Sequence, residues 1–479
     1  MKEINYGDDT PIAAFATTPG NSALTLIRCS GKGSIDLAAS VFAPAKLKDT
    51  RANTVIHGWI ISPSSEKIDE TLVSVFRAPK SYTGEDSLDI CCHGGPSAGA
   101  AVMSVLKSAG FREALPGEFT FRAFMNGKLD LTQSESVMEL VSAKTDSGRQ
   151  RAVNRLTGAL FTEINEIKTK LVEILSGAEL FLDYCEDEIG AGYDESEGRL
   201  PSKEKAGEVL ARLKKLAASW RSERIYQEGV LTVIAGRPNA GKSSLFNLLL
   251  KEDRSIVTDT PGTTRDWIEA WLSIDGLPLR LIDTAGLRES GDLSANASID
   301  IAEKIGMERS RMILDEADIV LYLIDSVEGL LPEDMGFLKD YKHKPLLVLW
   351  NKCDVIIPSR ERRGGTVENL TNRVIKFSVK SAEGLTELYT AITETVRGQQ
   401  NILTFDKIKT ALGSQRQKNL VDSACAALEE ALELANQNEP LDLIAPLLRE
   451  AVNSLGEITG EVSTSDIIEI MFSKFCVGK

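Results

Sequence analysis

The fold is decided by GVLTVIAGRPNAGKSSLFNLLL, Gly229–Leu250, which joins a strand, a glycine loop and a helix. GVLTVIAG has the continuous apolar character of a strand that is buried on both faces, and SLFNLLL has helical spacing. The loop between them, GRPNAGKSS at Gly236–Ser244, fits the phosphate-binding pattern G-x-x-x-x-G-K-S. This context favours a nucleotide site over a plain strand-to-helix turn.

Each residue type in this loop suits a phosphate group. Gly236 and Gly241 let the backbone wrap so that its N–H groups point at phosphate oxygens, and the helix N-terminus adds a favourable dipole. Lys242 supplies a positive charge to the outer phosphates, and Ser243 supplies a hydroxyl ligand for Mg²⁺. The sequence therefore predicts a metal-dependent nucleotide site.

Two later motifs identify the nucleotide. DTAG, Asp283–Gly286, ends the next strong strand and would place a carboxylate and a glycine amide beside the metal and the terminal phosphate. NKCD, Asn351–Asp354, ends another strand. The Asp354 carboxylate would accept hydrogen bonds from the ring N–H and the exocyclic amino group of guanine, a pair that adenine lacks. The expected nucleotide is GTP.

Other segments complete the expected site. Asn351 would bond the other edge of the purine, Lys352 would lie along the ring, and SVK, Ser378–Lys380, would give a backbone amide to the guanine carbonyl. TDTPGTTRD, Thr258–Asp266, fills the first switch position, with Thr264 as the second metal hydroxyl. The predicted GTP contacts are Asn239, Ala240, Gly241, Lys242, Ser243, Ser244, Thr258, Asp259, Thr260, Pro261, Gly262, Thr263, Thr264, Asp283, Thr284, Ala285, Gly286, Asn351, Lys352, Asp354, Ser378, Val379 and Lys380.

One expected group is missing. After DTAG, where many small GTPases carry a glutamine that orients water, this chain has Leu287. An apolar side chain cannot orient the attacking water. Another group must therefore do so.

The remaining sequence predicts a multidomain α/β and α protein. The strand runs GVLTVIAG, LRLIDTAG, DIVLYLID, KPLLVLWNK and RVIKFSVK predict a doubly wound, mostly parallel sheet of the Ras-like P-loop type. Helical spacing before and after them predicts one helical domain that this α/β domain interrupts. The expected parts are an α+β domain at 1–127, a helical segment at 128–228, the GTPase domain at 229–397 and a second helical segment at 398–479.

Bulk properties limit the function classes. A chain of 479 residues is too long for one core, and 42% hydrophobic with 26% charged residues is ordinary for a globular protein. The formal net charge of −15 excludes a broad cationic surface for nucleic acid. Seven scattered cysteines and the lack of a signal sequence or a long apolar run favour the cytoplasm. Cys91, Cys92 and His93 lack a second ligand cluster, so a metal there is disfavoured.

Taken together, the motifs resemble those of the MnmE family of tRNA-modification GTPases, also called TrmE. GRPNAGKSS, TDTPGTTRD, DTAGLRE, NKCD and the terminal FCVGK carry the resemblance, together with PGNSALTLIR, SYTGEDSLDI, HGGP and PGEFTFRAFMNGKLDL in the amino-terminal part. TTRD is shared with ribosome-assembly GTPases, so the combination with the terminal CxGK is the specific feature.

The resemblance implies a homodimer that works with an MnmG-type flavoprotein on the wobble uridine of tRNA. Together they would add an aminomethyl or carboxymethylaminomethyl group at the five-position, with 5-formyl- or methylene-tetrahydrofolate as the one-carbon donor. By matching position, K⁺ would be held by Asn239, Thr258, Thr260 and Thr263, where other GTPases use an arginine finger. Glu303 would orient the water, although without the resemblance it reads as a solvated helix charge.

The same resemblance implies folate contacts at Arg28, Asp89, Lys128 and the terminal Lys479. A carboxylate suits the amino-pyrimidine edge of a pterin, and cations suit its glutamate tail. Asp89 stands where some relatives have Glu, which shortens the reach but keeps the acceptor. Cys476 is either a nucleophile or part of a packed terminal segment, and no neighbouring base is evident.

Three functions remain open at this point. The first is an enzyme whose GTPase cycle drives tRNA modification. The second is a ribosome-assembly switch, which would predict a basic RNA-binding appendage where this chain has acidic helical and folate-like flanks. The third is a dimeric scaffold that binds folate without taking part in chemistry.

Overall fold

A computed structural model describes the chain at residues 6, 8–18, 20–44, 46–183, 200, 202–252, 268–283, 311–355, 373–399, 410–462, 468 and 471–478. The chain forms two compact units. The first contains Met1–Met138, Arg155–Lys214 and Ser414–Lys479, and the second contains Glu139–Asn154 and Lys215–Gly413. Within the described ranges, we find no helix with both the length and the apolar character that a membrane crossing needs.

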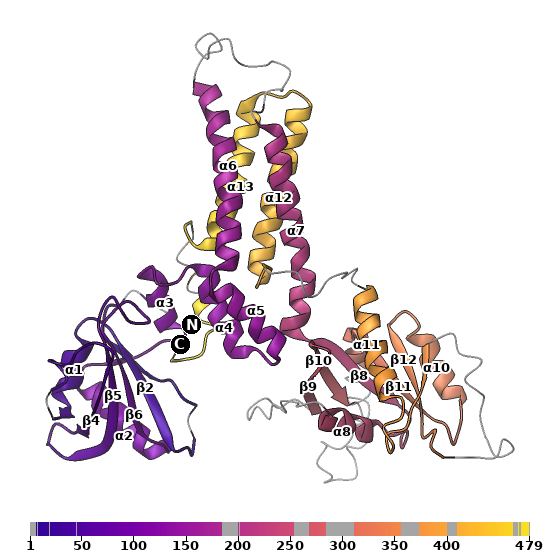
Figure 1. Ribbon diagram of the computed structural model, residues 1–479, viewed down its shortest axis with the longest axis horizontal. Coiled ribbons are helices and arrows are strands. Elements are labelled where there is room, and N and C mark those ends of the chain that lie inside the picture. The colour runs from indigo at the N-terminus through magenta and orange to yellow at the C-terminus, as the bar shows by residue number, and fades with distance from the viewer. Residues whose placement is uncertain are drawn as a thin grey trace, which may run out of the picture. The chain divides into compact units, whose positions relative to one another are not determined.

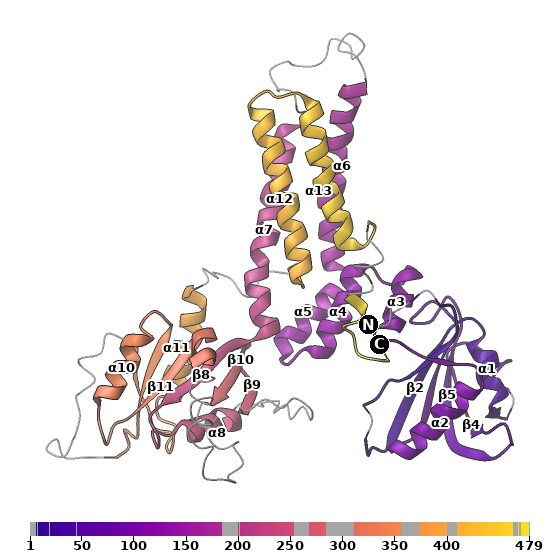
Figure 2. The same ribbon diagram turned by 180° about the vertical axis from the view of Figure 1, so that it is seen from behind.

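The amino-terminal part of the first unit is a seven-stranded sheet in the order β3-β4-β5-β6-β2-β1-β7. All neighbouring strands are antiparallel except β1 and β7. Helices α1 (Ser34–Ser40) and α2 (Pro96–Ser108) cover one face (Figures 1 and 2). The strands are β1 (Ile12–Phe15), β2 (Leu24–Ser30), β3 (Phe42–Ala43), β4 (Thr54–Ile61), β5 (Lys67–Phe76), β6 (Ser87–His93) and β7 (Arg112–Glu113).

Alternation along the strands separates the two faces of this sheet. In β2, Ile27 and Cys29 enter the core below α1 and α2, whereas Arg28 between them is only half-buried. Val55 of β4 and Leu72 of β5 are 59% and 47% exposed. Because successive strand residues point to opposite faces, Arg28 lies on the face that the helices leave open.

The rest of the first unit is helical. Helix α13 packs on both α12 and α6, so segments from before and after the GTPase domain share one bundle, which Figure 1 shows together with α7. The bundle helices are α6 (Ala159–Asp183), α7 (Lys203–Glu228), α12 (Gln415–Asn436) and α13 (Leu441–Thr459), and the shorter helices are α3 (Glu118–Met125) and α4 (Leu131–Ser142). Helix α5 (Asp146–Leu156) belongs mostly to the second unit, into which α7 continues from Lys215. This arrangement confirms the interrupted helical domain that the sequence predicts.

A buried polar cluster holds the returning chain in the bundle. Ser414 caps α12 by accepting a hydrogen bond from the backbone N–H of Gln417. Arg416 pairs with Glu135 of α4, Nε to Oε1 at 2.9 Å, and also donates to the carbonyl oxygen of Glu457 at 2.9 Å. Glu135 is 9% exposed, so this ion pair is partly desolvated and fixes α4 against the start of α12.

The second unit is a six-stranded sheet in the order β13-β12-β11-β8-β10-β9. Helices α8 (Lys242–Glu252) and α11 (Leu385–Gln399) pack on one face, and α10 (Pro332–Asp340) packs on the other. The strands are β8 (Val230–Gly236), β9 (Ile268–Ile274), β10 (Leu277–Asp283), β11 (Ile319–Asp325), β12 (Leu346–Asn351) and β13 (Arg373–Lys376). The predicted α/β fold class is thereby confirmed.

Five of these strands are parallel and match the five apolar runs of the sequence. The sixth strand, β9, pairs antiparallel with β10 at the sheet edge and was not among those runs. Its residues alternate between buried and half-buried, because an edge strand is covered less completely than a central one.

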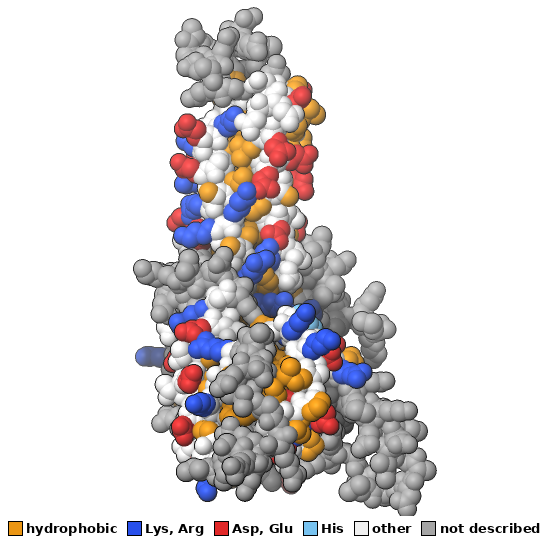
Figure 3. Space-filling view, turned by 90° about the vertical axis from the view of Figure 1, so that its right-hand side faces the viewer, with side chains coloured by type: hydrophobic (Ala, Val, Ile, Leu, Met, Phe, Trp, Pro, Cys, Tyr) orange, Lys and Arg blue, Asp and Glu red, His pale blue; other side chains and the backbone are white. Residues whose placement is uncertain are grey.

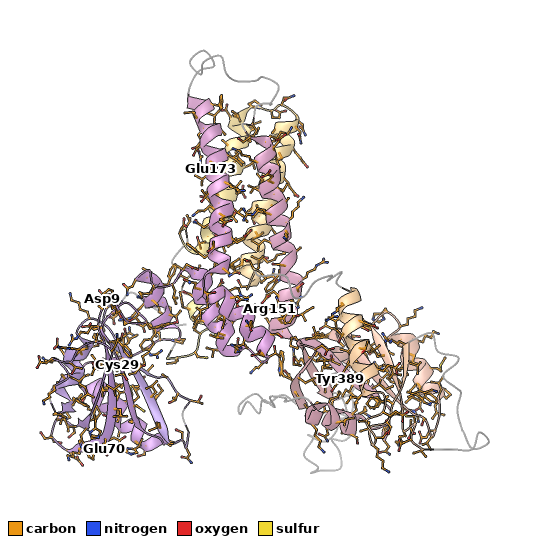
Figure 4. All side chains as sticks on the ribbon, viewed as in Figure 1. Asp9, Cys29, Glu70, Arg151, Glu173 and Tyr389 are labelled. Carbon is orange, nitrogen blue, oxygen red and sulfur yellow. The ribbon has the colours of Figure 1, made fainter. Side chains whose placement is uncertain are left out.

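Helices α5 and α7 brace the attachment of the GTPase domain inside this unit. Arg151, labelled in Figure 4, donates from Nη1 to Glu223 Oε2 at 2.9 Å, and its guanidinium lies 3.8 Å from the ring centre of Tyr226. Glu223 is 1% exposed. On the return path, Gln227 Nε2 donates to the carbonyl oxygen of Gly413 at 2.6 Å.

Candidate functional site

At two glycines of the turn between β8 and α8, atoms of other segments lie too close to leave room for a side chain. Gly236 has φ 144°, and a Cβ there would lie 2.5 Å from the carbonyl oxygen of Leu323. Gly241 has φ 104°, and a Cβ there would lie 2.5 Å from Asn351 Nδ2. Only glycine fits both conditions, so the loop can bring its N–H groups close to a phosphate.

Other residues of this loop are placed for phosphate and metal. Lys242 starts α8, and its Nζ donates to the carbonyl oxygens of Gly236 and Arg237, both at 2.9 Å. The ammonium therefore already lies within the loop. Ser243 and Ser244 are exposed in the first turn of α8, and Ala240 is buried beneath the loop.

The end of β12 joins the phosphate loop to the base-recognition segments. Asn351 is 2% exposed, and its Nδ2 donates to the carbonyl oxygen of Ala240 at 2.7 Å. Its Oδ1 accepts the backbone N–H of Val379 at 3.2 Å. A carboxamide has two N–H donors, so one remains for a purine. Asn351 thus brings together three segments that are distant in sequence.

Asp354 is exposed beside this junction. Its Oδ1 accepts a hydrogen bond from Ser378 Oγ at 2.7 Å, and Ser378 is fully buried. Ser378 Oγ in turn accepts the backbone N–H of Ser381 at 3.2 Å. A carboxylate has about four acceptor positions, so both oxygens can still receive guanine N–H groups. The motif SVK predicted only a backbone role for Ser378, whereas the Ser378 hydroxyl also donates to Asp354 and orients its carboxylate.

Three charged residues of this site escaped the sequence reasoning. Asp325 ends β11 and pairs with Lys352 Nζ at 2.6 Å, and the same Nζ donates to the carbonyl oxygen of Asn239 at 3.1 Å. Arg237 pairs with Asp334 of α10 at 3.1 Å. The position of Asp325 after the run IVLYLI resembles that of Asp283 after LRLI, and this was the available signal.

A metal at this site would depend on hydroxyl groups and phosphate oxygens. Asp283 ends β10 and is 2% exposed, and Ser243 lies at the start of the neighbouring α8. Within the described residues, no cluster of three His, Cys, Asp or Glu side chains could hold a metal alone. Mg²⁺ commonly takes one or two protein groups together with substrate phosphates and waters, so this donor set fits Mg²⁺.

Several predicted site residues lie outside the described residues: Thr258, Asp259, Thr260, Pro261, Gly262, Thr263, Thr264, Thr284, Ala285, Gly286, Glu303 and Lys479. The switch segment, most of the proposed K⁺ ligands and the proposed water-orienting Glu303 therefore stay predictions. Lys380 is described and exposed. Asn239 is exposed with φ 62°, which asparagine tolerates better than most residues.

The predicted folate contacts include one ion pair on the open face of the first sheet. Arg28 of β2 and Asp89 of β6 are register partners, and Nε lies 3.0 Å from Oδ1. Their side chains are 26% and 21% exposed. The Arg28 guanidinium is 5.8 Å from the ring centre of Tyr82, whose hydroxyl shares a hydrogen bond with Thr120 of α3. These groups leave a polar, accessible site beside an aromatic ring.

Lys128 and the carboxy-terminal segment approach the same domain. Lys128 is exposed, and its Nζ donates to the carbonyl oxygen of Pro79 at 3.1 Å. The carbonyl oxygen of Cys476 accepts the backbone N–H of Gly117 at 3.3 Å. A Cβ on Gly478 would lie 2.3 Å from the carbonyl oxygen of Phe15. The terminal segment therefore folds back onto β1, and the Cys476 side chain is exposed.

Burial distinguishes the cysteine nearest to the ion pair from Cys476. Cys29 follows Arg28 in β2 and is fully buried. Burial, with a smaller contribution from the charge of Asp89, raises the pKa of the Cys29 thiol far above its usual value. Since the thiolate is the nucleophile, Cys29 has a packing role, whereas Cys476 is exposed and Cys91 of β6 is half-buried.

Comparison with known proteins covers nearly the whole chain. The family model described as the GTP-binding protein TrmE N-terminus matches residues 11–128, and the MnmE helical domain model matches residues 131–476. Among solved structures, the G domain of the Thermotoga maritima FeoB iron transporter is 29% identical. That alignment covers 35% of this chain and 98% of the other, with a TM-score of 0.25.

Full-length relatives are more similar. The tRNA modification GTPase MnmE of Treponema denticola is 42% identical, with all of both chains covered. The protein of the same name from Desulforamulus reducens is 40% identical, over 98% of this chain and all of the relative. The chain belongs to the MnmE family of tRNA-modification GTPases.

Proposed function

We propose that this chain uses K⁺-stimulated GTP hydrolysis to drive modification of the wobble uridine of tRNA, together with an MnmG-type flavoprotein. The group added at the five-position would be of the aminomethyl or carboxymethylaminomethyl type, with a tetrahydrofolate as the one-carbon donor. Membership of the MnmE family and the GTPase fold support the hydrolytic core of this proposal. The observation that carries it is the joining of the phosphate loop to Asp354 by Asn351 and Ser378 in a chain that aligns end to end with these relatives.

Guanine specificity follows from the carboxylate of Asp354. A charged acceptor of two hydrogen bonds favours a base that presents two neighbouring N–H donors, and guanine does so. The Ser378 hydroxyl fixes the carboxylate at 2.7 Å before any base arrives. Less side-chain freedom is then lost on binding, which favours affinity.

A bound K⁺ would supply positive charge at the phosphates. Leu287 cannot orient water, and Asn239 stands in the phosphate loop with its side chain exposed. The Asn239 carbonyl is engaged by Lys352 at 3.1 Å, so its side-chain oxygen is the group to test. Thr258, Thr260 and Thr263 complete the proposed ligand set by resemblance.

The K⁺ proposal has a sharp test at Asn239. Because its φ is 62°, Asn239→Gly removes the side chain and tolerates the backbone, whereas alanine would add strain. We expect GTP turnover of the parent to be stimulated by K⁺ and much less by Na⁺, and the glycine variant to lose that difference. Equal turnover in the two salts, or a variant that still responds to K⁺, would contradict the assignment.

The folate proposal rests on the Arg28–Asp89 pair, Lys128 and the terminal segment. Support comes from the accessible pair beside Tyr82 and from the contact of Gly478 with Phe15, which brings the chain end to this domain. Lys479 follows Gly478 in the sequence and lies outside the described residues, so its part in the proposal comes from the resemblance alone. The carboxylate oxygens of Asp89 can accept hydrogen bonds from the N–H groups on the amino-pyrimidine edge of a pterin.

A homodimer built through the amino-terminal domains is part of the same proposal. The open face of the first sheet carries exposed apolar side chains, with Leu24, Val55 and Leu72 at 58%, 59% and 47% exposure. Apolar side chains on a single sheet face favour burial against another protein surface. The same face holds Arg28 and Asp89, so a second copy would lie beside the proposed folate site.

Contact with tRNA would be local or made through the partner. The chain has a formal net charge of −15, and basic and acidic side chains are interspersed along the face of the bundle that Figure 3 presents. A continuous cationic track for a phosphate backbone is therefore not expected. The proposed location is the cytoplasm, where tRNA, GTP and reduced folates are found.

Nucleoside analysis of tRNA from a deletion strain tests this function. We expect the modified wobble uridine to disappear and to return with the parent gene. Lys242→Ala and Asp89→Ala genes should each fail to restore it, one through GTP and the other through folate. Normal modification in the deletion strain would overturn the proposal. If the Asp89→Ala gene restores the modification and the Lys242→Ala gene does not, folate has no part in the proposed function.

A further inference from the structure

Six exposed cations of the amino-terminal domain have no ion pair within the described parts of the chain, and four of them lie in, or contact, the loops that precede β4 and follow β5. These four are Lys46, Arg51, Lys80 and Lys128, named here the basic rim. By contrast, many basic side chains elsewhere have a carboxylate partner, as in Arg416–Glu135 and Arg151–Glu223. In a chain with 70 acidic residues and a net charge of −15, a group of uncompensated cations requires an explanation.

Arg77 holds the segments that carry the rim together. Its Nε donates to the carbonyl oxygen of Thr50 at 3.1 Å, and its Nη2 donates to that of Lys48 at 2.5 Å. The backbone N–H of Lys80 donates to the carbonyl oxygen of Arg77 at 2.8 Å. Lys128 Nζ reaches the carbonyl oxygen of Pro79 at 3.1 Å. The segments that carry the rim are therefore linked to one another, although its residues span 46–128 in sequence.

Few acidic side chains lie near the rim, and two of them already have a hydrogen-bond or ion-pair partner. Lys48 pairs with Asp36 at 3.1 Å, and Asp86 Oδ1 accepts the backbone N–H of Ala78 at 3.0 Å. Asp49 is the remaining exposed carboxylate within the segment 46–51. Four cations against two carboxylates without a cation partner among the described residues, Asp49 and Asp86, leave a local positive potential, which attracts a polyanion.

The rim begins next to the proposed folate pair. In the register of β5 and β6, Ser74 is opposite Asp89, and Phe76, opposite Ser87, ends β5. Arg77 is the next residue, and the same loop places Tyr82 5.8 Å from the Arg28 guanidinium. One loop therefore connects the Arg28–Asp89 pair to the rim, and Lys128 of the rim contacts this loop at Pro79.

We propose that the basic rim binds the γ-linked oligoglutamate tail of the folate, so that this chain selects polyglutamylated over monoglutamylated tetrahydrofolate. The inference rests on the proposed folate site. A pterin held at Arg28 and Asp89 would direct its glutamate end toward Lys128. Each added glutamate contributes one carboxylate, and successive carboxylates would meet Lys80, Arg51 and Lys46. RNA phosphates would also be attracted, but the shared residue Lys128 and the connecting loop favour the tail.

Calorimetry on the full-length protein tests this directly, with the monoglutamate and the pentaglutamate of 5-formyl-tetrahydrofolate as probes. We expect the pentaglutamate to bind roughly tenfold more tightly at low salt, because several exposed ion pairs add modest increments. The difference should shrink as the salt concentration rises, since exposed charges are screened.

Matched double variants separate the rim from general charge effects. Arg51→Gln with Lys80→Gln should abolish most of the preference for the pentaglutamate and leave monoglutamate affinity unchanged. The control is Lys67→Gln with Lys107→Gln, which removes the same number of positive charges. Both residues lie outside the rim: Lys67 is at the start of β5, and Lys107 of α2 pairs with Glu113 at 3.1 Å. This control should keep the preference.

Each alternative outcome is decisive. Equal affinity of the parent for the two folates, or an equal loss of both affinities in the rim variant, would overturn the tail assignment while the folate site stands. Binding of neither folate to the parent would remove the proposed folate function itself. A rim variant that keeps the pentaglutamate preference but binds an anticodon stem-loop RNA more weakly would assign the rim to RNA.

Discussion

The nucleotide site and the Arg28–Asp89 site differ in how the chain constructs them. The nucleotide site takes Gly236, Asp283, Asp325 and Asn351 from the carboxyl ends of adjacent strands, where a parallel sheet gathers them at one edge. The other site depends on one cross-strand pair and on the fold-back of a terminus more than 300 residues away. A site at strand ends is therefore set by topology, whereas the second depends on tertiary packing.

The largest effect is expected for Asp354→Asn, which tests the nucleotide site. GTP affinity should fall at least about 100-fold, because an amide N–H replaces an acceptor opposite a guanine N–H, and charged hydrogen bonds contribute about 1.5–3 kcal/mol each. Xanthosine triphosphate should gain affinity, since its base presents a carbonyl there. The Ser378 hydroxyl can still donate to the amide oxygen, so the site should stay folded.

Fluorescent-nucleotide titration measures both affinities. Asp340→Asn is the matched control, because Asp340 is an exposed acid at the end of α10. It should behave like the parent. Unchanged GTP affinity in Asp354→Asn would contradict the assignment of the base site.

The outcome at these sites shows what a sequence can predict. Unbroken apolar runs such as IVLYLID identified the central parallel strands, because strands buried on both faces have no polar interruption. The edge strand β9 alternates, and that pattern carries less signal. Asn351, Asp354 and Ser378 were predicted as nucleotide contacts, and the structure brings them together.

Contacts between side chains were harder to foresee. The Arg237–Asp334 pair joins the phosphate loop to α10 across 97 positions, and spacing in sequence carries no information about it. The same holds for Arg77, which joins Lys48 and Thr50 to the loop after β5. Tertiary packing decides such pairs, so they require coordinates.

Glu303→Ala probes the part of the nucleotide site that resemblance alone supplied. GTP binding should remain nearly normal, and hydrolysis at saturating K⁺ should slow at least about tenfold, which corresponds to about 1.4 kcal/mol of transition-state stabilisation. Glu333→Ala, an exposed acid of α10, serves as the control for charge. Turnover within a factor of about two of the parent would make Glu303 a surface charge.

Ser378→Ala tests whether the buried hydroxyl orients Asp354. One lost hydrogen bond of about 1 kcal/mol predicts roughly fivefold weaker GTP binding, without a switch to xanthosine triphosphate. Ser381→Ala keeps the backbone N–H that donates to Ser378, so it should leave affinity unchanged. Equal affinity in all three proteins would mean that packing alone holds Asp354.

The smallest expected effect concerns the carboxy-terminus, where removal of Cys476–Lys479 should weaken formyl-tetrahydrofolate binding a few-fold. The deletion removes the carbonyl that accepts the Gly117 N–H and the residue that contacts Phe15, together with the proposed cation Lys479. Phe472 and Phe475 remain in the cluster with Tyr6 and Leu131, so the unit should stay folded. GTP hydrolysis should be nearly intact, because the nucleotide site belongs to the other unit.

Calorimetry and GTP turnover on the same preparations measure the two effects. Cys476→Ser in the full-length chain isolates the thiol and should bind folate like the parent. Equal folate affinity of the truncated and full-length chains would detach the terminus from the site, and a parallel loss of GTP turnover would show that the deletion disturbs both units.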